Sequence, residues 1–123
     1  PKEHRWSKTK ITEAWISAML SRQMYPVRVS DIGETAHRGI TVQQLKSLGH
    51  FVKSTPIPGL TWKQTNLYHI CDAFVKPITR SNACSFVEMV ASENQVPVWF
   101  ISHWWGTPFY QSLRLLQFHC LER

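Results

Sequence analysis

The pattern of apolar and polar positions along the chain predicts a series of amphipathic helices. Apolar residues recur at intervals of three and four between Ile11 and Met24, and again between Val42 and Val52, which is the spacing of one helix face. A third stripe of this kind runs from Leu67 to Val75. We expect that helix to end at the residue before Pro77, because proline lacks the backbone N–H that a helix interior needs.

Two capping signals set the expected starts of helices. Thr41 is followed three residues later by Gln44, and Ser85 is followed at the same interval by Glu88. In such a capping box, each side chain accepts a hydrogen bond from the backbone N–H of the other residue. The first pair therefore predicts the start of the second helix, and the second pair predicts a short fourth helix.

Towards the end of the chain the pattern changes to a short continuous apolar run. The segment from Val98 to Ile101 contains only β-branched and aromatic residues, which is typical of a strand covered on both faces. We expect this strand to span about 97–102. After a polar aromatic turn, Thr107 supplies a capping hydroxyl and Pro108 suits the first helical position, so a last helix is predicted to begin there.

These elements predict a helix-rich fold of the α/β or α+β class, with four to five helices. One clear strand is expected at about 97–102 and a candidate second strand at about 26–30, where valines alternate with other residues. A lone strand leaves its backbone N–H and C=O groups unpaired. Either these two strands pair, or the sheet is completed by a continuation beyond Arg123 or by a partner chain.

Composition narrows the class of protein. At 123 residues with 43% apolar side chains the chain can bury one core, and we expect a single domain over 11–123 after a basic tail over 1–10. No apolar run is long enough to span a membrane. Three cysteines without regular spacing are typical of an intracellular reducing compartment rather than of a disulfide scaffold.

The net charge of +6 favours an acidic partner, such as nucleic acid, an anionic lipid or an acidic protein surface. The one local cluster of basic residues lies in the tail, at Lys2, Arg5, Lys8 and Lys10. A solvated tail is the simpler interpretation of this cluster, and weak nucleic-acid binding through the tail is the alternative.

The turn between the expected strand and the last helix is the candidate binding site. Backbone N–H groups at the start of a helix, together with its positive dipole end, favour a phosphate or carboxylate, and tryptophan faces can stack on a base or sugar. The alternative is that the two tryptophans fill a gap between helices and the histidine caps a carbonyl group. The candidate ligand-binding residues are Ser102, His103, Trp104, Trp105, Gly106 and Thr107.

The chemistry of a metal site fits the sequence poorly. Zinc would need histidine and cysteine ligands that converge from short spacings, whereas His69 with Cys71, and His119 with Cys120, point to different faces of a helix. Cys84 and His103 are the further candidate ligands, and no short spacing joins them to either pair. We therefore expect neither a metal nor a cofactor.

A hydrolase built on Ser102 and His103 is disfavoured because adjacent strand residues point to opposite faces. Three carboxylates could act as remote partners of such a pair, but no pattern selects one of them. They are Asp72, Glu88 and Glu93.

The run Trp99-Phe100-Ile101-Ser102-His103, followed by Trp105 and a helix, resembles the first strand-helix unit of TIR-like domains (Toll/interleukin-1-receptor-like). The resemblance implies an α/β fold for about a fifth of the chain. Members of that family that cleave NAD use a glutamate on a later helix, and this chain ends before such an element.

A broader resemblance covers about half of the chain, through the segments 66–79, 84–91 and 97–109. Together they are similar to an uncharacterised family of unicellular algal proteins with a His-Trp-Trp-Gly-Glu/Thr-Pro motif, which stands here as His103 to Pro108. This resemblance implies no function.

These observations favour a non-enzymatic module for protein interaction or for binding an anionic ligand, which uses the turn from His103 to Thr107. The alternative is the N-terminal portion of a TIR-like enzyme that processes NAD or a nucleotide. Nucleic-acid binding through the basic tail is the third hypothesis.

Overall fold

A computed structural model describes residues 11–22, 24–97 and 106–122, with residues 119–122 described by their backbone only. The described residues are mainly helical, as the apolar pattern predicts. Its elements in chain order are α1 (Glu13–Leu20), the 3-10 turn η3 (Thr35–His37), α2 (Val42–Ser54), the 3-10 turn η4 (Trp62–Gln64), α3 (Leu67–Ile70), the π-helical segment η5 (Cys71–Val75), α4 (Lys76–Asn82), α5 (Phe86–Val90) and α6 (Phe109–Glu122).

Because α3, η5 and α4 follow one another without a gap, they form one long helix over 67–82, and the described residues contain five separate helices. In the same part of the chain, β-structure is limited to two isolated bridges, Arg38 with Gln95 and Asn66 with Pro108. The helix-rich class is therefore confirmed. The strand expected at about 97–102 is not: residues 98–102 lie outside the described residues, and Pro97 belongs to no strand.

The two predicted capping boxes are both present. At the start of α2, the backbone N–H of Gln44 donates to the hydroxyl of Thr41 and the backbone N–H of Thr41 donates to the Gln44 side chain, both at 3.0 Å. At the start of α5, Ser85 and Glu88 form the same reciprocal pair. Local side-chain chemistry therefore fixes where these helices begin.

The prediction that the third helix ends before Pro77 is wrong, because the helix continues to Asn82. The turn ahead of the proline widens into the π segment η5, in which the N–H of Lys76 donates to the carbonyl of Cys71, five residues back. Pro77 follows directly, and the wider turn accommodates both its ring and its missing N–H. The widened turn thus absorbs a residue that would break a regular helix.

The first helix is shorter than the apolar stripe predicts. It ends at Leu20 rather than Met24, and the hydroxyl of Ser21 donates to the carbonyl of Ala18 at 2.7 Å. The chain then turns so that the ring of Tyr25 reaches the core. Tertiary packing of the tyrosine therefore prevails over the local helical pattern.

The candidate strand at 26–30 is also wrong as a strand. The backbone N–H groups of Val29 and Ser30 both donate to the carbonyl oxygen of Glu88, at 2.8 and 3.2 Å. These hydrogen bonds go to a helix rather than to a second strand, so the segment lies extended against α5 without forming a sheet. The last helix begins one residue later than expected, at Phe109 rather than Pro108.

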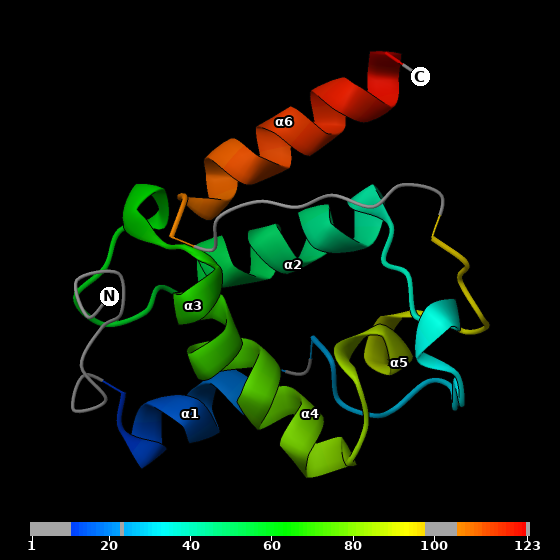
Figure 1. The fold of residues 1–123 in the computed structure, drawn as a ribbon. Helices are drawn as coiled ribbons and strands as arrows, with labels where there is room; N and C mark the ends of the chain where they lie inside the picture. Colours follow the sequence, from blue (N-terminus) through cyan, green and yellow to red (C-terminus); the bar gives the residue numbers. More distant parts are fainter. Residues whose placement is uncertain (1–10, 23, 98–105, 123) are drawn as a thin grey trace.

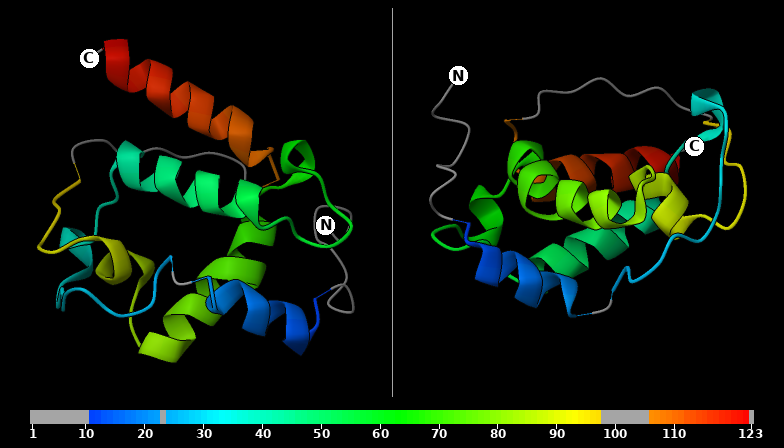
Figure 2. Two further views of the ribbon diagram at one scale, coloured as in Figure 1. Left: turned by 180° about the vertical axis from the view of Figure 1, so that it is seen from behind. Right: turned by 90° about the horizontal axis from the view of Figure 1, so that it is seen from below.

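Figures 1 and 2 show how the helices are arranged: α2 runs through the middle of the molecule, with α6 on one side and α1, the long helix 67–82 and α5 on the other. The first part of α6 packs on α2 and η4, while α1 packs on η5 and α4. In Figure 1 the C-terminal end of α6 rises away from α2.

The main core lies between these helices and draws on all of them. Edge-to-face aromatic contacts run through it: Trp15 on Phe74, Phe74 on Phe51, Phe51 on Tyr25, and Tyr25 on Phe86, with ring centroids 5.2 to 5.7 Å apart. The buried residues of this cluster are Met19, Leu48, Phe51, Val52, Ile57, Ile70, Ala73, Phe74, Ile78, Met89, Phe109 and Leu113. A separate, smaller cluster consists of Ile32, Val87 and Ala91.

The part of the chain that the structure describes contains no helix both long enough and apolar enough to cross a membrane.

Candidate functional site

Most of the predicted binding turn, Ser102, His103, Trp104 and Trp105, lies outside the described residues. Gly106 and Thr107 are described, and both are half-buried. The chain is then tied to the start of the long helix, because Pro108 forms a bridge with Asn66 and the N–H of Phe109 donates to the carbonyl of Thr65 at 2.8 Å. The end of the turn is thereby fixed where α6 begins.

The side chains of His119 and Cys120 lie outside the described part of the structure. The other residues that the sequence offered for chemistry are not brought together where they are described. His69 accepts a hydrogen bond from the backbone N–H of Asn66 at its Nδ1, so it completes the cap of α3. Asp72 pairs with Lys76 on the same helix at 2.9 Å, and Glu93 is exposed. Within the described ranges, no three histidine, cysteine or acidic side chains are grouped as metal ligands would be.

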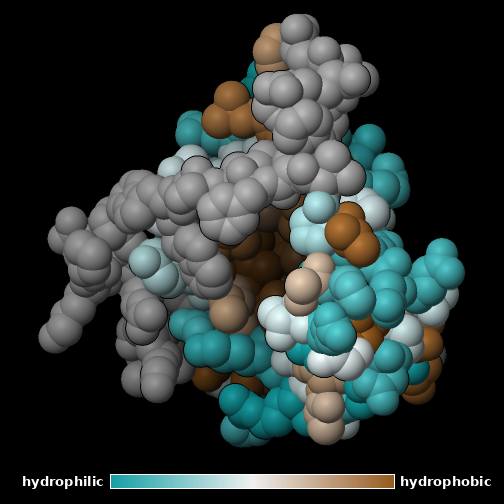
Figure 3. Space-filling model, turned by 45° about the vertical axis from the view of Figure 1, so that its right-hand side comes forward, coloured by the Kyte–Doolittle hydropathy of each residue, from teal (hydrophilic) through white to brown (hydrophobic). Residues whose placement is uncertain are grey.

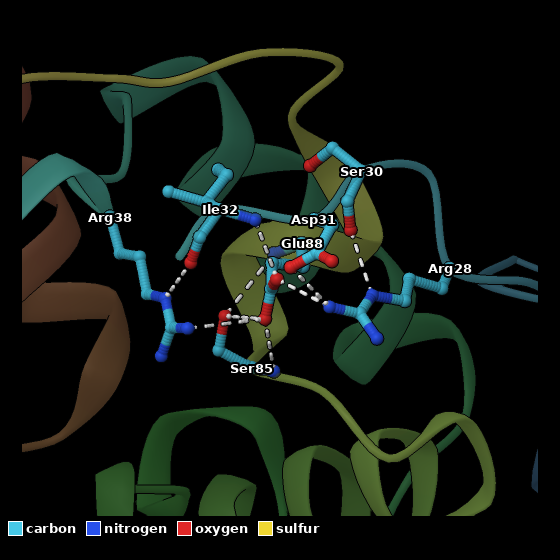
Figure 4. A network of polar contacts seen from close by, with 7 residues as sticks. All are labelled: Arg28, Ser30, Asp31, Ile32, Arg38, Ser85 and Glu88. Atoms are coloured by element: carbon cyan, nitrogen blue, oxygen red, sulfur yellow. Dashed lines mark hydrogen bonds and ion pairs between the residues drawn. The ribbon is translucent and has the colours of Figure 1, made fainter. Parts of the chain in front are cut away.

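Glu88 is the centre of the most extensive polar cluster in the described part of the chain (Figure 4). Its side chain is almost fully buried, at 2% exposure. One carboxylate oxygen accepts from the guanidinium of Arg28 and from the backbone N–H of Ile32, both at 2.7 Å. The other accepts from the N–H and the hydroxyl of Ser85, both at 3.0 Å.

A second arginine approaches the same carboxylate from the opposite side (Figure 4). Arg38 lies 3.8 Å from Glu88 and donates through its Nε to the carbonyl of Ile32 at 2.8 Å. Arg28 also pairs with Asp31, which is exposed. One buried carboxylate therefore holds two half-buried guanidinium groups, which satisfies the requirement that a buried charge be paired and hydrogen-bonded.

Hydrogen bonds decide the ionisation of this site. The backbone N–H groups of Ser85 and Ile32 and the Arg28 guanidinium lower the pKa of Glu88 to about 2, although burial acts in the opposite direction. Hydrogen bonding to Glu88 in turn raises the pKa of Arg28. Burial raises the pKa of the nearby Cys84 thiol, so this cysteine has no activated thiolate. The cluster therefore joins the segment 28–38 to α5.

Sequence reasoning identified Glu88 as a capping residue but missed its two arginine partners. Arg28 lies 60 residues from Glu88 along the chain, and no local pattern links positions so far apart. The sequence does contain one signal of such a partner: Glu88 is the acidic residue in the otherwise apolar segment FVEMV. A buried carboxylate needs a partner of opposite charge, so this pattern indicates a basic residue close to it in the fold.

The outer face of α6 is the other notable surface. Phe109, Ser112 and Leu113 are buried against the body, whereas Leu115 and Phe118 are 68% and 64% exposed. Gln111 and Arg114 are exposed on that same side. At 100° per residue these four positions fall within one 100° sector of the helix, opposite the buried residues. We call Gln111, Arg114, Leu115 and Phe118 the outer face of α6.

Figure 3 shows that apolar side chains reach the surface in the upper part of the molecule, where α6 lies, and at the floor of a hollow in the middle of that face. Two large apolar side chains on one helical sector form a small exposed patch rather than isolated exposed residues.

Comparisons with protein-family models, with curated proteins and with solved structures gave no match to this chain.

Proposed function

We propose that this chain is a non-enzymatic protein-interaction module that binds its partner through the outer face of α6, next in sequence to the aromatic turn His103–Thr107. The observation that carries the proposal is the exposure of Leu115 and Phe118 on a helix whose opposite side is anchored in the core. Anchors three residues apart are typical of a helix that lies in an apolar groove of another protein.

The charge around these anchors indicates the chemistry of the partner. Arg114 is exposed in the same sector of α6, and the whole chain carries a net charge of +6. A groove with an apolar floor and an acidic rim complements both features, since rim charges of opposite sign steer association and fix its register. We therefore infer that α6 enters an apolar groove with an acidic rim on the partner protein.

Burial of the two anchors would supply part of the binding free energy. Full burial of a leucine or phenylalanine side chain contributes about 1.5–3 kcal/mol. Because roughly two thirds of each side chain remains to be buried, Leu115 and Phe118 together would contribute about 2–4 kcal/mol to complex formation. The rest of the interface would supply the remaining binding free energy, because association itself costs about 4 kcal/mol or more.

Site-specific photocrosslinking tests this function. A photoreactive phenylalanine analogue at position 118 should give one dominant crosslinked partner, whose affinity for the purified chain is then measured with and without the substitution Leu115→Glu. The matched control carries the analogue at Val27, which is similarly exposed at 62% but lies on the other side of α2. Equal crosslinking from both positions, or an affinity that Leu115→Glu leaves unchanged, would refute the proposal.

The alternative function is an enzyme that processes NAD or a nucleotide, with this chain as its N-terminal part. It is supported by the resemblance of Trp99–His103 to the first strand of TIR-like domains. Incubation of the full-length gene product with NAD should then release nicotinamide. Absence of turnover by that product would remove this alternative.

A further inference from the structure

The segment from Arg28 to Arg38, which we call the strap, contains one short 3-10 turn and is otherwise irregular. Its first half is held at one residue of α5. The N–H groups of Val29 and Ser30 donate to the backbone carbonyl of Glu88, and the N–H of Ile32 donates to its carboxylate. The guanidinium of Arg28 also binds that carboxylate. A single residue therefore anchors four successive contacts of the strap.

The second half of the strap is held by Glu88 and by the segment after α5. Arg38 pairs with the Glu88 carboxylate at 3.8 Å. The N–H of Gln95 donates to the carbonyl of His37 at 2.8 Å, and the N–H of Gly39 donates back to the carbonyl of Gln95 at 2.7 Å. This end resembles a hinge, because two backbone hydrogen bonds hold it at one place.

Apolar packing under the strap is separate from the main core. Ile32 is 1% exposed and packs with Val87 and Ala91 in a cluster of its own. Met89 of the same short helix faces the main core instead. Displacement of Ile32 would therefore uncover the outer side of α5 without opening the aromatic contacts between the other helices.

We propose that the strap is a detachable latch: it opens as a unit from α5 while the main core stays folded, and Glu88 is the residue that holds it closed. Proteins open locally in units that have few buried contacts of their own. Ile32 is the buried apolar residue of this unit. The polar contacts of the first half of the strap with α5 go to the backbone carbonyl or to the carboxylate of Glu88. Opening exposes a small apolar surface, formed by Val87 and Ala91, beside the carboxylate of Glu88. This inference is independent of the role of α6.

Native-state hydrogen exchange of the full chain at increasing low urea concentrations tests the latch. In the wild-type chain, the amides of Val29, Ser30 and Ile32 should exchange through openings with a small urea dependence, because little surface is exposed, whereas those of Ile70 and Ala73 should show the larger dependence of global unfolding. If the two groups of amides exchange at the same rate and with the same urea dependence, the strap unfolds together with the main core, and the proposal is overturned.

The substitution Glu88→Gln keeps the size of the side chain and removes its charge. It should accelerate exchange of the three strap amides by about tenfold or more, as expected for loss of hydrogen bonds to a charged group, and leave Ile70 and Ala73 nearly unchanged. Equal acceleration at all sites, or none in the strap, would contradict the latch.

Because Glu88→Gln also alters the capping box of α5, Arg28→Ala provides a second test that leaves that box intact. Its matched control is Arg80→Ala, an exposed arginine on α4. Selective acceleration of the strap amides by Arg28→Ala and not by Arg80→Ala is expected. The same exchange pattern in both variants would overturn the assignment of Arg28 to the latch.

Discussion

Removal of the Phe74 ring should be among the most destabilising single changes in the described core. Phe74 is fully buried, at 0% exposure, and makes edge-to-face contacts with Trp15 at 5.4 Å and with Phe51 at 5.6 Å. It thereby links α1 and α2 through the long helix. Truncation of a buried phenylalanine to alanine costs about 3–5 kcal/mol, because transfer free energy is lost and a cavity remains.

The substitution Phe74→Leu separates the two parts of this loss. Leucine retains most of the apolar volume but removes both ring contacts, each of which contributes about 0.5–1.5 kcal/mol beyond area burial. We therefore expect Phe74→Leu to cost about 1–3 kcal/mol and Phe74→Ala about 3–5 kcal/mol. Since domains of this size have a free energy of unfolding of about 5–15 kcal/mol, Phe74→Ala would remove a large share of it.

Urea denaturation followed by circular dichroism measures these losses as shifts of the midpoint at constant slope. Leu115→Ala is the control, because it also truncates an apolar side chain, but one that is 68% exposed, and it should change stability by less than about 0.5 kcal/mol. The reasoning fails if Phe74→Ala costs no more than Leu115→Ala, since the contacts described for the ring would then contribute nothing to the fold.

Three further predictions concern backbone strain, helix packing and pH. Ala83 ends α4 in the left-handed region at φ 51°, so Ala83→Gly should stabilise the chain by about 0.5–1 kcal/mol, and an unchanged urea midpoint would contradict this. A Cβ at Gly49 would lie 3.3 Å from the Phe109 ring, so the larger side chain of Gly49→Leu should overpack the contact between α2 and α6. The free energy of unfolding should fall by about 1–3 kcal/mol. An equally stable variant would show that α6 moves freely. Because the pKa of Glu88 is lowered from 4.5 to about 2, the contribution of its carboxylate to stability is complete above pH 4.5 and is lost as pH falls towards 2. The urea midpoint of the wild type should therefore drop more steeply in this window than that of Glu88→Gln. Parallel curves for the two proteins would refute the stabilising role of the Glu88 carboxylate.

The parts of the fold that could be predicted from the sequence are those fixed by local interactions. The capping boxes at Thr41 and Ser85 join residues three apart, so the starts of α2 and α5 follow from the sequence alone. The apolar face of α2 likewise supplies Leu48 and Val52 to the core. The capping partners lie within one turn of the helix, and the apolar face is a repeat within one helix, so both can be recognised in the local sequence.

The errors arise where distant residues decide the outcome. A proline normally ends a helix, but packing of Ile78 in the core, after Pro77, favours continuation through a π segment. The N–H groups of the extended backbone before Ile32 donate to a carbonyl of α5, and the alternation of side chains in the sequence does not indicate such a partner. Prediction of the site was affected most, because the two arginine partners of Glu88, Arg28 and Arg38, lie 60 and 50 residues away along the chain. The predicted binding turn, in addition, lies largely outside the described residues.

Binding affinity for the crosslinked partner is the measurement that tests the central claim most directly. If the outer face of α6 enters an apolar groove, Phe118→Ala should weaken binding roughly 5- to 30-fold, which corresponds to about 1–2 kcal/mol from burial of the exposed two thirds of its side chain. Val27→Ala, which truncates a side chain of similar exposure on the other side of α2, should leave the affinity unchanged. Equal affinities of Phe118→Ala and the wild-type chain, with both folded, would contradict the account.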